Sequence, residues 1–213
     1  TRTLEAESGL NDPVAVLLVI ALISAITEPG FGTLDALWLL VRQLAMDPPL
    51  RVGGVHAVGN LLVVMSTEGS RTTLLDLSDP ADPRPIPGGS FLIDDGTTIA
   101  GRPRVMTSYF GHVNGNRAYH ARHFTGGGLI VYDITDFSRP TFMGNYQYPG
   151  RANGGYVFIK EDTAFVGMSN LGVALDIRNP RMMTVQREFH MTGDLDFVNP
   201  IGNVAVLYRQ NPD

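Results

Sequence analysis

The sequence predicts a mainly β protein: an incomplete β-propeller of about three blades plus one strand, preceded by an α-helical, membrane-type segment. Three observations support this prediction. Residues 13–26 carry no charge, whereas from residue 47 onward short apolar runs alternate with Gly, Pro, Asn, Asp and Ser. A strand-then-turn signature recurs three times in this second part. The composition changes at Asp47-Pro48-Pro49, so we place two domains at residues 1–46 and 47–213.

Composition excludes some classes of function. The 213 residues include 16 Lys or Arg and 21 Asp or Glu, giving a net charge of -5. This balance offers no basic surface for phosphates, so nucleic acid is not an expected partner. The chain has no cysteine, which excludes disulfides and thiolate metal sites. Its 24 glycines and 14 prolines favour short strands and turns over long helices.

The N-terminal apolar run predicts a helix. A helix over residues 9–27 has 19 residues, close to the roughly 20 that span a bilayer. A secretory signal is disfavoured because Glu5 and Glu7 stand where a positive region is expected. A buried helix of a soluble domain, capped by Asn11 and Asp12 ahead of Pro13, remains an alternative.

The segment LEAESGLNDPVAVLL, residues 4–18, resembles the Asn-Asp motif of bacterial sodium or potassium/proton antiporters of the cation:proton antiporter superfamily. The resemblance covers residues 1–46. It implies that Asp12 binds a monovalent cation and a proton alternately, that Asn11 supports this site, and that residues 9–27 lie in a membrane. A carboxylate at low dielectric has a raised pKa, which suits such competition. Transport needs a bundle of many helices, so we expect only a remnant of an antiporter here.

Repeats organise the second part. Asp76, Asp133 and Asp176 each end an apolar strand, with spacings of 57 residues (76 to 133) and 43 residues (133 to 176). Tight-turn signals recur upstream of them, at residues 59–60, 115–116 and 161–162, and once more at 202–203. Short strands repeated at this spacing are typical of propeller blades. We expect the three aspartates to form turns through hydrogen bonds to nearby backbone.

Residues 128–133, GLIVYD, provide the best copy of a strand signature that resembles LVIVD-repeat proteins. This resemblance covers residues 50–213 and implies an extracytoplasmic bacterial β-propeller with an unknown ligand or protein partner. Three repeats and one further strand do not close a ring of four to eight blades. The terminal blades are therefore expected to expose apolar faces and unpaired edges, which favours self-association.

Histidines recur at equivalent repeat positions. His56 and His112 each stand four residues before the turn asparagine, where the next two repeats have Phe158 and Asn199. Equivalent positions face the same way, so His56, His112 and Asn199 are candidates for a metal or anion site near the central channel. Ordinary polar lining of the channel is the alternative.

Function remains open between three interpretations. The first is a non-enzymatic propeller module for binding or scaffolding, joined to an antiporter remnant at the cell membrane or envelope. The second is a fragment of a cation/proton antiporter. The third is an artificial or misassembled fusion without evolved function. We find no serine elbow, phosphate loop or zinc spacing, and therefore expect neither enzymatic activity nor a cofactor.

Overall fold

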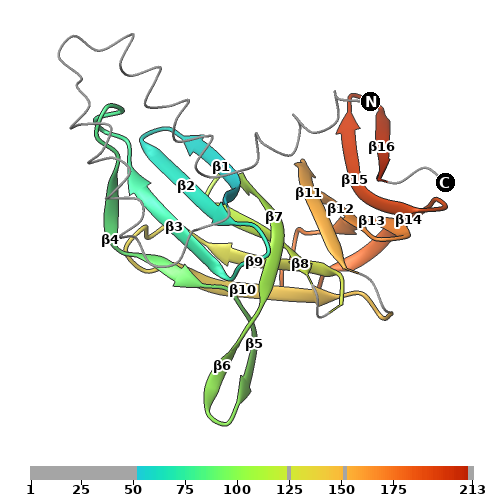
Figure 1. Cartoon of the computed structure of the whole chain (residues 1–213), viewed down its shortest axis with the longest axis horizontal. Coiled ribbons are helices and arrows are strands. Elements are labelled where there is room, and N and C mark those ends of the chain that lie inside the picture. The colour runs from blue at the N-terminus through green and yellow to red at the C-terminus, as the bar shows by residue number, and fades with distance from the viewer. Residues whose placement is uncertain (1–51, 124–125, 151–152, 211–213) are drawn as a thin grey trace, which may run out of the picture. The chain divides into compact units, whose positions relative to one another are not determined.

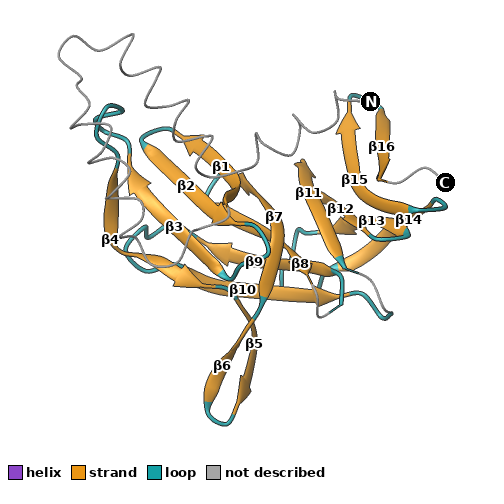
Figure 2. Ribbon diagram, viewed as in Figure 1, coloured by secondary structure: helices purple, strands orange, loops and turns teal. Residues whose placement is uncertain are grey.

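The computed structural model describes residues 52–123, 126–150 and 153–210 as strands and connecting loops (Figure 1). The described residues belong to one compact unit, Val52–Asp213. Figure 2 shows strands and loops over this part of the chain, without a helix. Within these ranges no helix has the length and apolarity needed to span a bilayer. The helix predicted for residues 9–27, with Asn11 and Asp12, lies outside the described residues.

Three antiparallel four-stranded sheets follow one another along the chain, and we call them blades 1 to 3. Blade 1 contains β1 (Val52–Val58), β2 (Leu61–Ser66), β3 (Arg71–Asp76) and β4 (Arg84–Leu92). Blade 2 contains β7 (Thr107–Asn114), β8 (Arg117–His123), β9 (Gly128–Asp133) and β10 (Thr141–Gln147). Blade 3 contains β11 (Gly154–Lys160), β12 (Thr163–Met168), β13 (Leu171–Asp176) and β14 (Thr184–His190).

A fourth sheet is begun but holds two strands, β15 (Asp194–Ile201) and β16 (Val204–Gln210), rather than the single strand that the sequence predicted. The second strand forms because the turn at Gly202 returns the chain along β15. A further hairpin, β5 (Asp94–Ile99) and β6 (Arg102–Val105), was not expected. It projects from the sheets between blades 1 and 2 (Figure 1). The observed architecture is therefore mainly β and propeller-like.

The tight turns between the first two strands of each repeat share one backbone conformation. The first turn residue has φ of 58° at Gly59, 58° at Gly115, 52° at Glu161 and 57° at Gly202. Left-handed φ at this position suits a two-residue hairpin turn whose twist matches that of the strands. The repeat recognised from sequence spacing is therefore also a repeat of backbone geometry.

The turn-forming role expected for the repeat aspartates is confirmed. One carboxylate oxygen of Asp76 accepts the Ser78 backbone N–H at 2.8 Å, and Asp133 accepts that of Thr135 at 2.7 Å. Asp176 accepts the N–H of Arg178 at 3.0 Å and also pairs with its guanidinium. These contacts lower the pKa of Asp176 to about 2, mainly through the Arg178 side chain. The aspartates thus terminate each third strand locally.

Neighbouring blades bury their faces against each other. One cluster joins blades 1 and 2 and includes Val63 and Met65 of β2 together with Ile130 of β9. A second cluster joins blades 2 and 3 through residues such as Val131 and Val166. Alternate residues of β9 enter different clusters, so both faces of blade 2 are buried.

Glycines allow strands of neighbouring sheets to approach one another closely. A Cβ added at Gly167 would lie 2.0 Å from the backbone oxygen of Asp196, and one at Gly155 would lie 2.5 Å from that same atom. A Cβ at Gly111 would lie 2.1 Å from the sulfur of Met65. A side chain does not fit against the Asp196 backbone at these separations, so Gly155 and Gly167 set the spacing between blade 3 and the fourth sheet.

We expect Gly167→Ala to lower the free energy of unfolding by about 1–3 kcal/mol, because the added methyl overlaps the backbone of β15. Urea unfolding followed by circular dichroism measures this change. Gly150→Ala is the matched control, since Gly150 is exposed and its Cβ would meet only the Tyr148 ring, at 3.3 Å. Equal stabilities of the two variants would contradict this account of blade spacing.

His120 provides a second test of the packing. It is 1% exposed, neither ring nitrogen has a hydrogen-bond partner among the described residues, and its ring lies 6.1 Å from that of Tyr132. Burial, followed by the charge of His56, lowers the pKa of His120 to about 3. The unfolded chain therefore binds a proton near pH 6.5 that the folded chain does not bind until about pH 3.

Stability should consequently fall as the pH drops below 6.5, with a slope approaching about 1.4 kcal/mol per pH unit from this residue. His120→Phe keeps an aromatic ring in an apolar site and should flatten that slope. Unfolding free energies measured between pH 7 and pH 4 for both proteins test the expectation. An unchanged pH dependence in His120→Phe would show that His120 is not buried in its neutral form.

Candidate functional site

The two histidines singled out by the repeat lie side by side on β1 and β7. The ring centroids of His56 and His112 are 5.3 Å apart, in an edge-to-face arrangement. His56 Nε2 lies 2.9 Å from the backbone oxygen of Gly111, and because a carbonyl only accepts, this nitrogen is the donor. Burial lowers the pKa of His112, and the neighbouring His56 lowers it further. His112 is therefore neutral at pH 7.

Aromatic side chains continue from His56 and His112 along the inner strands of the following sheets, and we call this series the row. Phe158 on β11 lies next to His112, with centroids 6.4 Å apart, and Phe197 on β15 lies 4.7 Å from Phe158. Asn199 stands two residues beyond Phe197 on the same strand. Over the described ranges no group of three or more His, Asp or Glu side chains is arranged to hold a metal ion. The metal or anion site at His56, His112 and Asn199 thus remains a prediction, with Phe158 standing between its two parts.

A β-bulge recurs near the start of the inner strands. In β7 the register passes from Ser108 opposite Arg122 to Gly111 opposite His120, so Tyr109 and Phe110 together face one residue of β8. The same shift occurs between residues 154 and 157 of β11 and between 194 and 197 of β15. Bulges of this kind redirect side chains and are frequent beside binding sites. Tyr156 is a bulged residue of β11, and Asp196 is a bulged residue of β15 in the neighbouring sheet.

Four of the bulge residues and His123 of β8 form one cluster, which we call the bulge cluster: Tyr109, Phe110, His123, Tyr156 and Asp196. The Phe110 and Tyr156 rings stack at 3.9 Å, with 13° between their planes. Tyr109 stacks on His123 at 4.8 Å, and His123 Nδ1 lies 2.8 Å from the backbone oxygen of Gly154. All five side chains are half-buried. The cluster therefore combines an aromatic surface with a carboxyl group, a phenol and an imidazole.

Electrostatics single out Asp196 within the bulge cluster. Burial raises its pKa, the nearby carboxylate of Asp194 raises it further, and His123 opposes both effects. Burial also raises the pKa of Tyr109 and of Tyr156, with Asp196 contributing in each case. Both phenols consequently stay protonated and can donate hydrogen bonds at neutral pH. A carboxyl of raised pKa among hydrogen-bond donors is a feature that concentrates at functional sites.

The sequence alone did not predict the bulge cluster, although equal spacing from the turn marks two of its aromatic residues, Phe110 and Tyr156. Phe110, Tyr156 and Phe197 each stand six residues before the second turn residue of their repeat. The same count identified the two histidines, which stand four residues before that turn residue. Asp196 and His123 had no such signal, because His123 comes from the second strand of its blade and Asp196 has no acidic counterpart in the other repeats.

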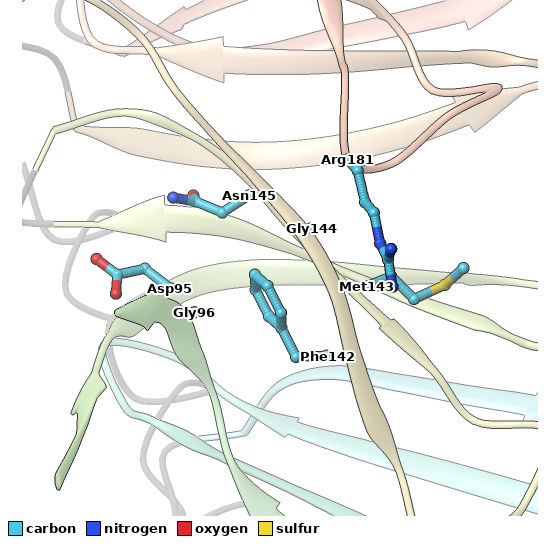
Figure 3. Close-up of a pocket in the computed structure, with 7 residues that line it drawn as sticks. All are labelled: Asp95, Gly96, Phe142, Met143, Gly144, Asn145 and Arg181. Carbon is cyan, nitrogen blue, oxygen red and sulfur yellow. The ribbon is translucent and has the colours of Figure 1, made fainter. Parts of the chain in front are cut away.

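A pocket of ≈ 440 Å³ lies elsewhere, where β5 meets β10 (Figure 3). Figure 3 shows Phe142, Asn145 and Asp95 on one side of β10 and Arg181 on the other. The complete lining is Asp95, Gly96, Phe142, Met143, Gly144, Asn145 and Arg181. Its acidic and basic side chains do not converge on one point, so the pocket is a less suitable reaction site than the bulge cluster.

The polar side chains near this pocket are engaged with one another. Arg122 is fully buried, and its Nη1 donates to Asn145 Oδ1 at 2.6 Å. Arg104 Nη1 lies 3.3 Å from a carboxylate oxygen of Asp95. Burial raises the pKa of Asp95, but hydrogen bonds from Thr97 and the charges of both arginines outweigh this effect, so the net shift is downward. Arg104 and Asp95 pair within the β5–β6 hairpin and Arg122 and Asn145 pair within blade 2, so we assign these contacts a structural role.

No family model matches the chain. The antiporter and LVIVD-repeat resemblances therefore receive no support from that comparison. Two solved structures are similar at the level of the fold. A periplasmic gluconolactonase of Pseudomonas aeruginosa is 9% identical with a TM-score of 0.51, over 69% of this chain and 42% of that chain. A putative 6-phosphogluconolactonase of Bacteroides fragilis is 12% identical with a TM-score of 0.50, over 67% of this chain and 40% of that chain.

These comparisons correct one prediction. We expected no enzymatic activity, and that prediction is contradicted, because proteins named as lactonases share the fold. The expectation was based on the absence of contiguous catalytic motifs. Inner-strand side chains of successive repeats are separated by about 40 residues or more of sequence, so a site built from them leaves no such motif. The chain matches only about two fifths of the length of each lactonase structure.

The raised pKa of Asp196 can be measured directly. Carboxyl carbon NMR should show Asp196 titrating above the usual value of 3.8, with Asp176, at about 2, as an internal reference in the same spectra. Asp194→Asn should lower the pKa of Asp196, because it removes the neighbouring negative charge. The pKa of Asp196 is higher in the folded state than in the unfolded state. The free energy of unfolding therefore falls as the pH rises from the unfolded-state pKa to the folded-state pKa. An Asp196 that titrates at or below 3.8 would exclude it as the perturbed group.

Proposed function

We propose that residues 52–213 form part of an extracytoplasmic β-propeller whose bulge cluster binds a small polyhydroxylated molecule of the sugar-acid or sugar-lactone class. The observation that carries this proposal is the half-buried Asp196, with its raised pKa, near Tyr156, whose ring stacks on Phe110. The location at the cell envelope follows the LVIVD resemblance. Cation exchange at Asn11 and Asp12 has no support in the described residues or the comparisons and forms no part of the proposal.

The chemistry of the bulge cluster suits such a ligand. An aromatic surface packs against the apolar C–H face of a sugar ring, while polar groups at its rim fix the orientation of the hydroxyls. The carboxylate of Asp196 accepts hydrogen bonds from hydroxyls. The protonated phenols of Tyr109 and Tyr156 donate to ring or carbonyl oxygens, since burial raises the pKa of each. The lactonase names of two neighbours agree with this class of ligand.

Lactone hydrolysis is a second candidate function, favoured by the raised pKa of the half-buried Asp196. A carboxylate with a raised pKa is a better general base than an ordinary one. In this reaction Asp196 takes a proton from water, the water oxygen bonds to the lactone carbonyl carbon, and the ring C–O bond breaks. The departing ring oxygen receives that proton back from Asp196 and becomes the hydroxyl of the product acid.

Calorimetric titration of the full chain with D-gluconate and with D-glucono-1,5-lactone tests binding. Asp196→Asn should weaken binding by about tenfold or more, because it removes a charged hydrogen-bond acceptor. Glu188→Gln is the matched control, since Glu188 lies on the outer strand β14 and should leave binding unchanged. Binding by neither compound, or equal binding by Asp196→Asn, would refute the proposal. Acid release from the lactone faster than its spontaneous hydrolysis, with this excess lost in Asp196→Asn, would show catalysed hydrolysis in addition.

A further inference from the structure

The carboxyl group of Asp196 occupies space that Gly155 leaves open, one residue before Tyr156. A Cβ added at Gly155 would lie 2.8 Å from Asp196 Oδ1 and 2.8 Å from the Asp196 Cα. Only a residue without a side chain admits the carboxyl group at this separation. Asp196 is a bulged residue of β15, and its side chain is half-buried. The backbones of two neighbouring sheets therefore hold a carboxyl group at the bulge cluster.

Two further acidic side chains adjoin the same place. Asp194 stands two residues before Asp196, where the β15 register begins to shift. Glu68 lies in the connection between β2 and β3, and the residue after it bridges to Ser108 of β7. The backbone N–H of Ser108 donates across this bridge at 2.8 Å, and Tyr109 follows directly in the chain. Acidic residues of blade 1 and of the fourth sheet are thus placed near the bulge cluster.

The phenol of Tyr109 responds to all three carboxylates. Burial raises its pKa most, and the charges of Asp196, Glu68 and Asp194 raise the pKa further, in that order. In the described part of the chain, no lysine or arginine is among the groups that shift the pKa of Tyr109, Tyr156 or Asp196. The field at the bulge cluster disfavours a phenolate, and a negatively charged ligand meets the same field.

We propose that Asp194 and Asp196 make the bulge cluster select neutral sugar lactones over sugar acids and sugar phosphates. This inference rests on the proposed function, because it concerns the ligand of that same site. Like charges brought together in a contact cost free energy that a neutral ligand of similar shape avoids. A sugar acid is a carboxylate at pH 7, and a phosphate group carries a charge of about -1.5 to -2. The hydroxyls of a neutral lactone, in contrast, donate to Asp196 without repulsion.

The two aspartates have different parts in this selection. Asp196 accepts hydrogen bonds from the ligand and also repels anions, whereas Asp194 acts through its charge alone. In the hydrolytic alternative, the acid formed by ring opening ionises at neutral pH. Repulsion by both carboxylates then lowers the affinity for the product and favours its release.

Calorimetric titration of the full chain with D-gluconamide and with D-gluconate measures the selection. The two compounds share their chain of hydroxyl groups and differ in charge at one end. Gluconate should have a dissociation constant about tenfold or more above that of gluconamide. This ratio should shrink as sodium chloride rises from about 10 mM to about 500 mM, because salt screens the repulsion.

Asp194→Asn tests the residue itself. It should narrow the ratio of the two dissociation constants by about threefold or more, because it removes a repulsive charge and leaves the Asp196 acceptor in place. Glu188→Gln is the matched control, since it removes one negative charge from the outer strand β14 and should leave the ratio unchanged. Circular dichroism on both variants checks that the blades remain folded.

The outcomes separate this inference from the proposed function. Equal dissociation constants for gluconamide and gluconate would overturn the selection by charge and leave sugar binding standing. A ratio that Asp194→Asn does not change, or that Glu188→Gln changes equally, would overturn it as well. Binding of neither compound, nor of D-glucono-1,5-lactone, would refute sugar binding itself and this inference with it.

Discussion

The close approach of consecutive sheets is the constraint from which the rest of this structure follows. Twisted sheets can pack face to face this tightly only where one strand presents no side chain, and Gly167 meets this requirement against the backbone of Asp196. The hydrophobic clusters on either side of blade 2 then form outward from these contacts. A polar side chain caught between the blades, such as His120, is held neutral by its burial.

The same constraint connects the fold to the candidate site. The bulges occur where the inner strands approach one another, and they redirect the side chains that adjoin the contact. The backbone oxygen of Asp196 packs against Gly155 and Gly167, while its carboxyl group joins the bulge cluster. The position of the candidate general base therefore depends on blade spacing rather than on a local motif. The bulge cluster adjoins the side chains that follow His56 and His112 along the inner strands, because Tyr156 lies 5.3 Å from Phe197 between ring centroids.

In a repeat fold, the position of a residue within its repeat decides which face of the sheet it occupies. This explains why valines such as Val55 in the first sheet and Val206 in the fourth are exposed. Each repeat places apolar residues on both faces because a repeat within the series packs against a neighbour on each side. The first and fourth sheets follow the same rule although one neighbour of each is absent from the described residues. The exposed faces are thus a direct consequence of the repeat. The fold shared with lactonases is consistent with a series of blades that continues around a closed ring.

Short-range signals were enough to predict the repeat, its turns and the number of complete blades, because strand alternation, left-handed turn residues such as Gly59 and aspartates such as Asp133 act over a few neighbouring residues. Equal spacing also predicted that His56 lies near His112, since it implies equal position in the blade. The membership of the bulge cluster, in contrast, depended on how the sheets pack. His123 and Asp196 belong to different strands of different sheets, and the burial that raises the pKa of Asp196 exists only once the inner strands come together.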